Sequence, residues 1–237
     1  MKKTTVFRLL IWILISGFTG LFFQNPALCG TIKDTESASH ADTAAIPVVL
    51  KTYDFPGVKI VQFNLAVLSQ YSYMVVSGKD AMVVDPARDI GAYVDLAKKE
   101  GWNIKGVFLT HSNADFVAGH MEFVKSLGCP VYQSKESGTL YKIHGLSDGE
   151  TITWGEATLK FLSTPGHTPD GMCVLVYGKD SKTTPVAILT GDTLFVGSIG
   201  RPDLMGGAMA AATLAGMGYD TWTRKLSTLD DSVVVLP

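Results

Sequence analysis

The sequence predicts a mixed α and β fold in which helices cover sheets. Strand-like apolar runs separated by turn residues occupy the chain between residues 58 and 84. From residue 90 onward, helix-like and strand-like patterns alternate along the chain. Hydrophobic residues make up 46% of the sequence and charged residues 18%. This composition supports a sizeable core and excludes wholesale disorder.

The individual elements follow from local periodicity and turn residues. Ile90, Tyr93, Val94 and Ala97 recur at helical spacing, and Gly101 is expected to end that helix. We expect the other helices at 121–127 and 220–229, and the first at 90–100. We expect strands at 58–68, 71–77, 81–84, 104–109, 130–133, 150–153, 158–163, 172–177, 186–189 and 233–236. Because the chain stops just after the last strand begins, we expect it to be a fragment of a longer protein.

The N-terminus has the layout of an export signal. Two lysines follow Met1, residues 9–23 are mostly apolar, and a polar region of small residues comes next. We therefore expect a signal peptide at 1–29, a linker at 30–46 and one domain at 47–237, with export to the periplasm. The alternative is a membrane anchor formed by an uncleaved N-terminal segment.

Charge and cysteine content narrow the partners. The formal net charge is −2 and no run of Lys or Arg occurs beyond the first residues, so the sequence does not favour nucleic-acid binding. Cys129 and Cys173 remain after removal of the signal peptide. Both lie in apolar stretches without C-x-x-C spacing, so we interpret them as buried thiols. The alternative, in an oxidising compartment, is that the two cysteines form a disulfide.

Three segments place a potential metal ligand directly after an apolar strand. These ligands are His111, His167 and Asp192. Loops at strand ends can converge on one pocket. Two imidazoles and one carboxylate suit non-haem iron(II), because they occupy one face of the ion and leave other positions open. Each residue alone is weak evidence, since a single His after a strand is more often an ordinary surface or core residue.

Taken together, the segments resemble a known family. Thr110-His111 followed by Asp115, Thr-Pro-Gly-His-Thr at 164–168 and Thr-Gly-Asp-Thr-Leu-Phe at 190–195 resemble the three metal-binding motifs of the metallo-β-lactamase superfamily. The run 189–204 is similar to the persulfide dioxygenase branch, and 114–120 to the branch fused to rhodanese domains. The resemblance covers about 58–237. It implies a four-layer αββα sandwich with the metal at one edge of the two sheets.

Two departures from the family pattern bear on the metal. The superfamily motif reads T-H-x-H-x-D-H, and here Asn113 and Phe116 replace its second and last His. A phenyl ring cannot bind metal, and an amide oxygen is a weaker donor than imidazole. The resemblance therefore implies one iron(II) per chain on His111, His167 and Asp192, with zinc as the alternative. Metal-bound imidazoles need supporting partners. We expect these supporting residues to be Asp85, Asn113, Asp115 and Arg201, with an ion pair between Arg201 and Asp203.

The resemblance implies an enzyme that oxidises a thiol persulfide, such as glutathione persulfide, with O2 to sulfite. A rhodanese domain or partner fits this activity. For the oligomeric state, a homodimer is one alternative. One alternative is a zinc-dependent thioester hydrolase resembling glyoxalase II, which the residues at 113 and 116 disfavour. The other is a degenerate exported binding module of the same fold, which Asn113 alone supports.

Overall fold

Strand residues alternate between two packing environments, and this alternation produces two stacked sheets. The computed structural model describes residues 46–237 except 114, 182 and 205. In β10 (Met172–Tyr177), Val174 and Val176 pack into the core between the sheets, whereas Cys173 and Leu175 pack on the opposite face. Side chains of successive strand residues point to opposite faces, so one apolar strand serves two layers.

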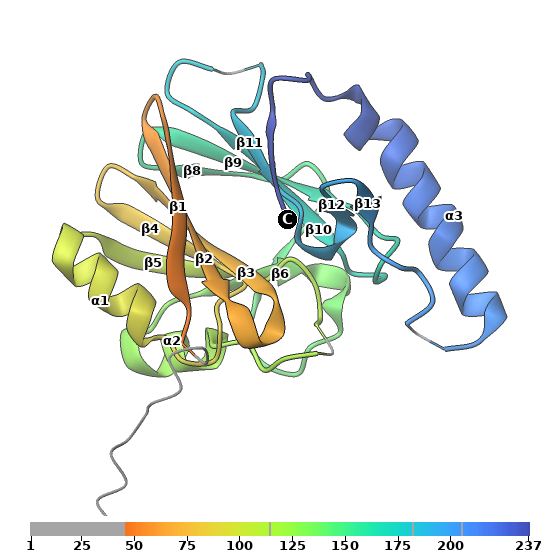
Figure 1. The fold of residues 1–237 in the computed structure, drawn as a ribbon, viewed down its shortest axis with the longest axis horizontal. Coiled ribbons are helices and arrows are strands. Elements are labelled where there is room, and N and C mark those ends of the chain that lie inside the picture. The colour runs from red at the N-terminus through yellow and green to blue at the C-terminus, as the bar shows by residue number, and fades with distance from the viewer. Residues whose placement is uncertain (1–45, 114, 182, 205) are drawn as a thin grey trace, which may run out of the picture. The chain divides into compact units, whose positions relative to one another are not determined.

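The first sheet has seven strands in sequence order (Figure 1). Strands β1 to β4 pair antiparallel, and β4 to β7 pair parallel. The strands are β1 (Val48–Phe55), β2 (Val58–Leu65), β3 (Gln70–Ser77), β4 (Asp80–Val84), β5 (Asn103–Phe108), β6 (Val131–Ser134) and β7 (His144–Leu146).

The second sheet has the order β14-β11-β10-β9-β8. Its remaining strands are β8 (Thr151–Trp154), β9 (Ala157–Ser163), β11 (Ala187–Leu189) and β14 (Val234–Leu236). Strand β14 pairs parallel with β11, and the other neighbours pair antiparallel. A separate short hairpin joins β12 (Leu194–Phe195) to β13 (Ser198–Ile199).

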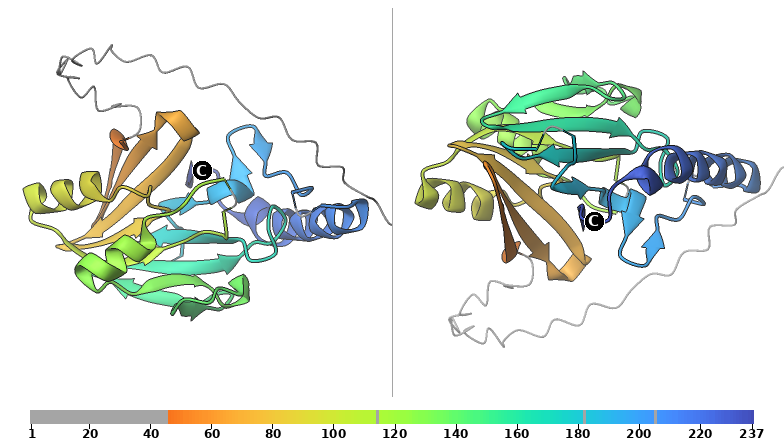
Figure 2. Two further views of the ribbon diagram at one scale, coloured as in Figure 1. Left: turned by 90° about the horizontal axis from the view of Figure 1, so that it is seen from below. Right: turned by 90° about the horizontal axis from the view of Figure 1, so that it is seen from above.

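A helix or a short helical turn packs on the outer face of each sheet. Helices α1 (Gly91–Glu100) and α2 (His120–Leu127) bury Tyr93 and Phe123 against the first sheet. The turn after α3 (Ala208–Arg224) buries Leu226 against the second (Figures 1 and 2). The expected mixed α and β sandwich is therefore confirmed. A glycine in the left-handed region ends α1 at Gly101 (φ +71°), as predicted, and another ends α2 at Gly128 (φ +66°).

Several boundaries differ from the sequence-based expectations. Strand β1 and the short β7 were missed, and the strand expected at 58–68 ends at Leu65, where a 3₁₀ turn, Ala66–Leu68, begins. Helix α3 starts at Ala208 rather than at 220. Alanines are strong helix formers, but the glycines at 216 and 218 obscure the periodicity of that helix.

The expected signal peptide lies outside the described residues, as does the linker up to residue 45. Within the part of the chain that the structure describes, no helix is long and apolar enough to cross a membrane.

Candidate metal centre

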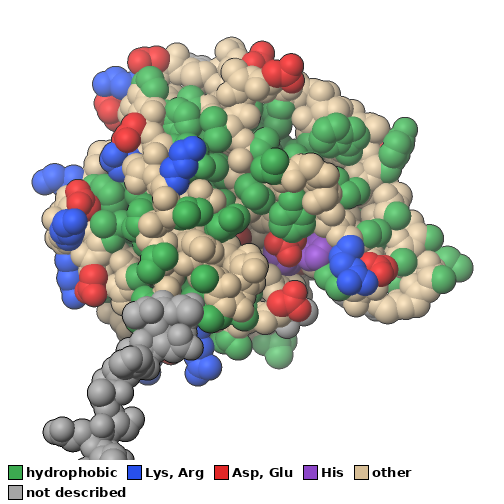
Figure 3. Space-filling view, viewed as in Figure 1, with side chains coloured by type: hydrophobic (Ala, Val, Ile, Leu, Met, Phe, Trp, Pro, Cys, Tyr) green, Lys and Arg blue, Asp and Glu red, His purple; other side chains and the backbone are tan. Residues whose placement is uncertain are grey.

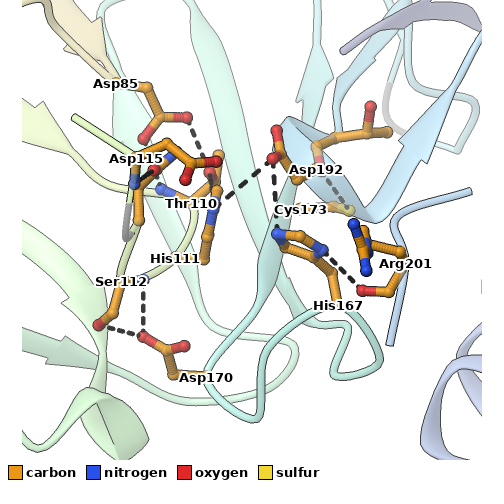
Figure 4. A network of polar contacts seen from close by, with 12 residues as sticks. Asp85, Thr110, His111, Ser112, Asp115, His167, Asp170, Cys173, Asp192 and Arg201 are labelled. Atoms are coloured by element: carbon orange, nitrogen blue, oxygen red, sulfur yellow. Dashed lines mark hydrogen bonds and ion pairs between the residues drawn. The ribbon is translucent and has the colours of Figure 1, made fainter. Parts of the chain in front are cut away.

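The ends of three strands bring two imidazoles and a carboxylate together. His111 follows β5, His167 follows β9, and Asp192 lies in the 3₁₀ turn Gly191–Thr193 after β11 (Figure 4). The Nε2 atoms of His111 and His167 lie 4.0 and 3.5 Å from Oδ2 of Asp192. One potential ligand atom from each residue lies within 4.8 Å of the others. The three residues predicted from sequence therefore meet at one point.

A chain of hydrogen bonds fixes the orientation of His111. Oδ2 of Asp85 accepts the hydroxyl hydrogen of Thr110 at 2.7 Å. The same hydroxyl oxygen lies 3.0 Å from Nδ1 of His111 and, having given its hydrogen to Asp85, accepts from that nitrogen. Nδ1 of His111 therefore carries the proton, and Nε2 presents its lone pair toward Asp192.

A backbone carbonyl fixes the second imidazole in the same way. Nδ1 of His167 donates to the carbonyl oxygen of Arg201 at 3.0 Å. A carbonyl oxygen can only accept, so Nε2 of His167 is also left with a free lone pair. The two rings stand nearly perpendicular, at 81°, with centroids 5.2 Å apart. Partners of this kind on the outer nitrogen are typical of metal-binding histidines.

These donors fit a single metal ion. Two ligand atoms bound at about 2.1 Å lie roughly 3.0–3.5 Å apart in ordinary coordination geometries. The two separations from Asp192 are 3.5 and 4.0 Å, and all three ligand atoms lie within 4.8 Å of one another, so binding of one ion would draw them closer together. Two neutral imidazoles and one carboxylate match the donor set of zinc and of non-haem iron(II).

Comparison with known proteins establishes the family. The model of the metallo-β-lactamase superfamily matches residues 65–237. The chain belongs to the metallo-β-lactamase superfamily. Members of this superfamily bind metals such as zinc or iron, and the three converging residues form a candidate metal site in this member.

Individual relatives share part of the chain. An uncharacterised Mycobacterium leprae protein is 30% identical over 187 residues, covering 68% of this chain and 81% of that protein. A hydroxyacylglutathione hydrolase-like protein from Gallus gallus is 34% identical over 135 residues. That match covers 55% of this chain but only 46% of the chicken protein.

Solved structures show the same fold. A metallo-β-lactamase from Staphylococcus aureus superposes with a TM-score of 0.69 at 32% identity, over 76% of this chain and 55% of that one. ETHE1 from Myxococcus xanthus superposes with a TM-score of 0.64 at 24% identity, over 74% of each chain. The described residues thus span little more than half of the Staphylococcus aureus chain.

Asp85 is a partly buried support of the candidate metal site. Its backbone adopts the left-handed region with φ +48°, directly after β4, and Asp tolerates this conformation better than most residues. Burial raises the pKa of Asp85, while the nearby His111 and the hydrogen bonds from Thr110 oppose that rise. The structure therefore places Asp85 behind the first imidazole, where the sequence predicted a supporting residue.

The other predicted supporting residues lie differently. Asn113 lines the small cavity beside His111, and its Oδ1 accepts the backbone N–H of Asp115 at 2.7 Å. The side chain of Asp115 is exposed and lies outside that ligand cluster. Arg201 supports His167 through its carbonyl rather than its guanidinium. The guanidinium instead forms the expected pair with Asp203, with both hydrogen bonds at 2.7 Å.

Sequence reasoning missed two supporting residues. Thr110 links Asp85 to His111, and its place directly before a ligand histidine was the available signal. Asp170, only 5% exposed, accepts both the backbone N–H and the hydroxyl of Ser112, at 3.0 and 2.7 Å. This carboxylate anchors the loop that begins with His111, and its position in the sequence gave no indication of that contact.

The thiols take no part in the cluster. Cys129 and Cys173 are free and buried, as interpreted from the sequence. Burial raises the pKa of Cys173 to about 11, so its thiol stays protonated and is a poor metal ligand. Its sulfur contacts Thr164 Oγ1 at 3.2 Å, on the core side of the site.

Proposed function

We propose that this chain is a mononuclear iron enzyme that oxidises a thiol persulfide with O2, releasing the thiol and sulfite. The observation that carries the proposal is the convergence of His111, His167 and Asp192. Phe116, beside them, cannot serve as a ligand to a second ion. Iron(II) on two histidines and one carboxylate supplies open coordination positions and the redox chemistry that O2 activation requires.

The proposed reaction balances with water as the third oxygen source. R–S–S⁻, O2 and H2O give R–SH, SO3²⁻ and H⁺, so the S–S bond breaks, the outer sulfur is oxidised and O2 is reduced. The residues of this chain orient the reactants. A cavity of about 140 Å³ beside His111 and Asp192 has Phe116 and Phe195 among its lining residues. Its size suits a sulfur terminus together with O2, and the aromatic rings limit access of bulk water.

Metal content and oxygen uptake test the proposal together. Protein prepared anaerobically with iron(II) is expected to hold about one iron per chain and to consume O2 when given a persulfide. His111→Ala is expected to abolish both. His144→Ala is the matched control, because His144 is exposed on β7 and pairs with Glu150 at 3.4 Å. Full iron content in His111→Ala would refute the ligand assignment.

The second candidate is a zinc-dependent thioester hydrolase. The 34% identity to the hydroxyacylglutathione hydrolase-like chicken protein favours it. It predicts about two zinc ions per chain and thioester hydrolysis without O2 uptake, through attack by a metal-activated water. The residues at 113 and 116 disfavour a second ion. A chain that retains no metal under either preparation would instead be a binding module.

We also propose that residues 1–29 direct export and that a rhodanese-type sulfurtransferase supplies the persulfide. The charged, apolar and small-residue regions of the N-terminus support export. A fusion of 1–29 to an enzyme that is active only after export is expected to be active. Replacing part of the apolar run 9–23 with charged residues is expected to abolish that activity.

A further inference from the structure

A cleft beside the candidate metal centre is large and free of charged walls. It measures about 650 Å³ and lies between α3 and the β12–β13 hairpin, with His167 among its lining residues. Figure 3 shows histidine side chains in a hollow, with acidic side chains and a basic side chain at its rim and hydrophobic side chains around it. The hydrophobic walls of the cleft include Phe195, Ile199, Leu214, Ala215, Tyr219 and Trp222.

The electrostatics of this cleft disfavour an ionic ligand. Among the described residues that line it, none is Asp, Glu, Lys or Arg. Arg201 lies between two lining residues in the sequence, but Asp203 engages its guanidinium with two hydrogen bonds. Glutathione carries two carboxylates and an ammonium group. The cleft is open to solvent on one side, since Tyr219 and Trp222 in its wall are 70% and 46% exposed. Charges held against its apolar walls would lose part of their water without gaining partners there, which is costly.

The cleft and the small cavity lie on either side of the candidate ligands. His111 and Asp192 line the small cavity, His167 lines the cleft, and Phe195 lines both. Because both spaces share Phe195, the cleft is a neighbouring apolar space for the organic group of a molecule whose sulfur terminus lies at the ligand atoms. A volume of about 650 Å³ is in the range of small-molecule sites.

We propose that this cleft binds the apolar, uncharged organic group of the sulfur substrate, so that the enzyme acts on apolar persulfides in preference to glutathione persulfide. The proposal rests on the proposed function for the reacting sulfur group only. The preference for an apolar ligand follows from the walls of the cleft and can be measured without metal or turnover.

Two unreactive thioethers with the same methylthio group provide the probes. Hexyl methyl sulfide is uncharged, and S-methylglutathione carries the charges of glutathione. Each is titrated into metal-free protein while tryptophan fluorescence is recorded, since Trp222 lines the cleft and is 46% exposed. We expect hexyl methyl sulfide to bind at least about tenfold more tightly. We expect Trp222→Phe to remove the fluorescence change.

Charged substitutions on α3 locate the binding. Ala215→Glu places a carboxylate in the cleft and is expected to weaken hexyl methyl sulfide about tenfold or more. Ala215→Lys is expected to improve the affinity of S-methylglutathione. Ala212→Glu is the matched control, because Ala212 is exposed on the same helix and does not line the cleft. Its affinity for both probes is expected to equal that of the unaltered protein.

The outcomes separate the two proposals. If S-methylglutathione binds as tightly as hexyl methyl sulfide, or if Ala215→Glu has no effect, the cleft proposal is wrong. It is also wrong if sedimentation shows a dimer that Ala215→Glu dissociates and neither probe binds, because a second copy then occupies the cleft. If the probes bind as expected to both the metal-free protein and His111→Ala, but no persulfide supports O2 uptake, only the proposed function fails.

Discussion

Asp85 accepts two hydrogen bonds from Thr110: the backbone N–H donates to Oδ1 at 2.9 Å, and the side-chain hydroxyl donates to Oδ2 at 2.7 Å. The strand end at β5 is therefore tied to the strand end at β4. The hydroxyl oxygen keeps a lone pair for Nδ1 of His111 at 3.0 Å. One carboxylate thus sets both the position and the tautomer of the first candidate ligand.

Thr110→Val tests this relay. The isosteric change removes the donor to Asp85 and the acceptor for His111, so the imidazole loses its fixed tautomer. We expect metal affinity to fall by about 10–100-fold. Competition with a chromophoric chelator measures the metal affinity of the variant and of the unaltered protein. Thr153→Val, at an exposed strand position, is the control and is expected to leave the affinity unchanged.

Asn113→His restores one superfamily histidine without creating a second metal site. The change replaces the amide that accepts the backbone N–H of Asp115 and places an imidazole in the small cavity. We expect the rate of O2 uptake to change while metal content stays at about one ion per chain, because Phe116 still cannot bind metal. Elemental analysis measures the metal content of this variant and of Asn103→His, a control at an exposed position. A gain of a second ion would show that the ligand assignment is wrong.

Gly200→Ala is expected to disrupt the candidate centre by steric contact alone. An added Cβ would lie 1.8 Å from the backbone oxygen of Asp192 and 2.8 Å from Cβ of His167. We expect metal binding to be lost and the free energy of unfolding to fall by about 1–3 kcal/mol. Gly216→Ala, in α3 with open space at its Cβ, is expected to raise stability by roughly 0.5–1 kcal/mol. Denaturant titrations compare the two, and unchanged metal binding in Gly200→Ala contradicts the close approach.

The pair Asp148–Lys225 predicts an acid-dependent loss of stability. Burial alone would raise the pKa of Asp148, but hydrogen bonds from Lys225 and from the backbone of Ser163 outweigh it and hold that pKa below 3.8. A depressed folded-state pKa stabilises the protein fully above the unfolded value, and the contribution disappears as pH falls through the folded one. Because both side chains are partly exposed, the contribution is expected to be below about 1 kcal/mol.

Urea unfolding of the unaltered protein and of Lys225→Met measures that contribution. The difference in unfolding free energy between them is expected to be largest above pH 5 and to shrink below pH 3.8. Lys179→Met, which removes the exposed partner of Glu156, serves as the control. A difference that grows toward low pH would contradict the assigned direction.

Much of the fold could be predicted because its signals are local. The helical spacing of Tyr93 and Ala97 with Gly101 beyond them fixed α1, and the apolar run at 172–177 coincides with β10. Strand β1 escaped because five of its eight residues are consecutively exposed, so the strand lacks the alternation that marks a half-buried one. The long α3 escaped because few of its side chains are buried and no apolar stripe marks it.

The candidate ligands were predictable because each motif is contiguous in the sequence. The supporting contacts were not, because they join residues distant along the chain. Thr110 meets a carboxylate 25 residues earlier, and His167 meets the carbonyl of a residue 34 positions later. Every residue has a backbone carbonyl, so the sequence does not indicate which carbonyl will accept a hydrogen bond. The prediction therefore named Arg201 for its side chain, whereas its carbonyl supports His167.

The three converging side chains come from opposite sides of the sandwich. His111 extends from the seven-stranded sheet, whereas His167 and Asp192 extend from the five-stranded one. A cation bound by all three would link the two sheets at this edge of the sandwich, and its loss would remove that link. Such binding would raise the free energy of unfolding of the native protein. The increase would be about 4 kcal/mol at a free metal concentration a thousand times the dissociation constant. A low concentration of the ion would consequently lower the stability of the folded protein as well as its rate of turnover.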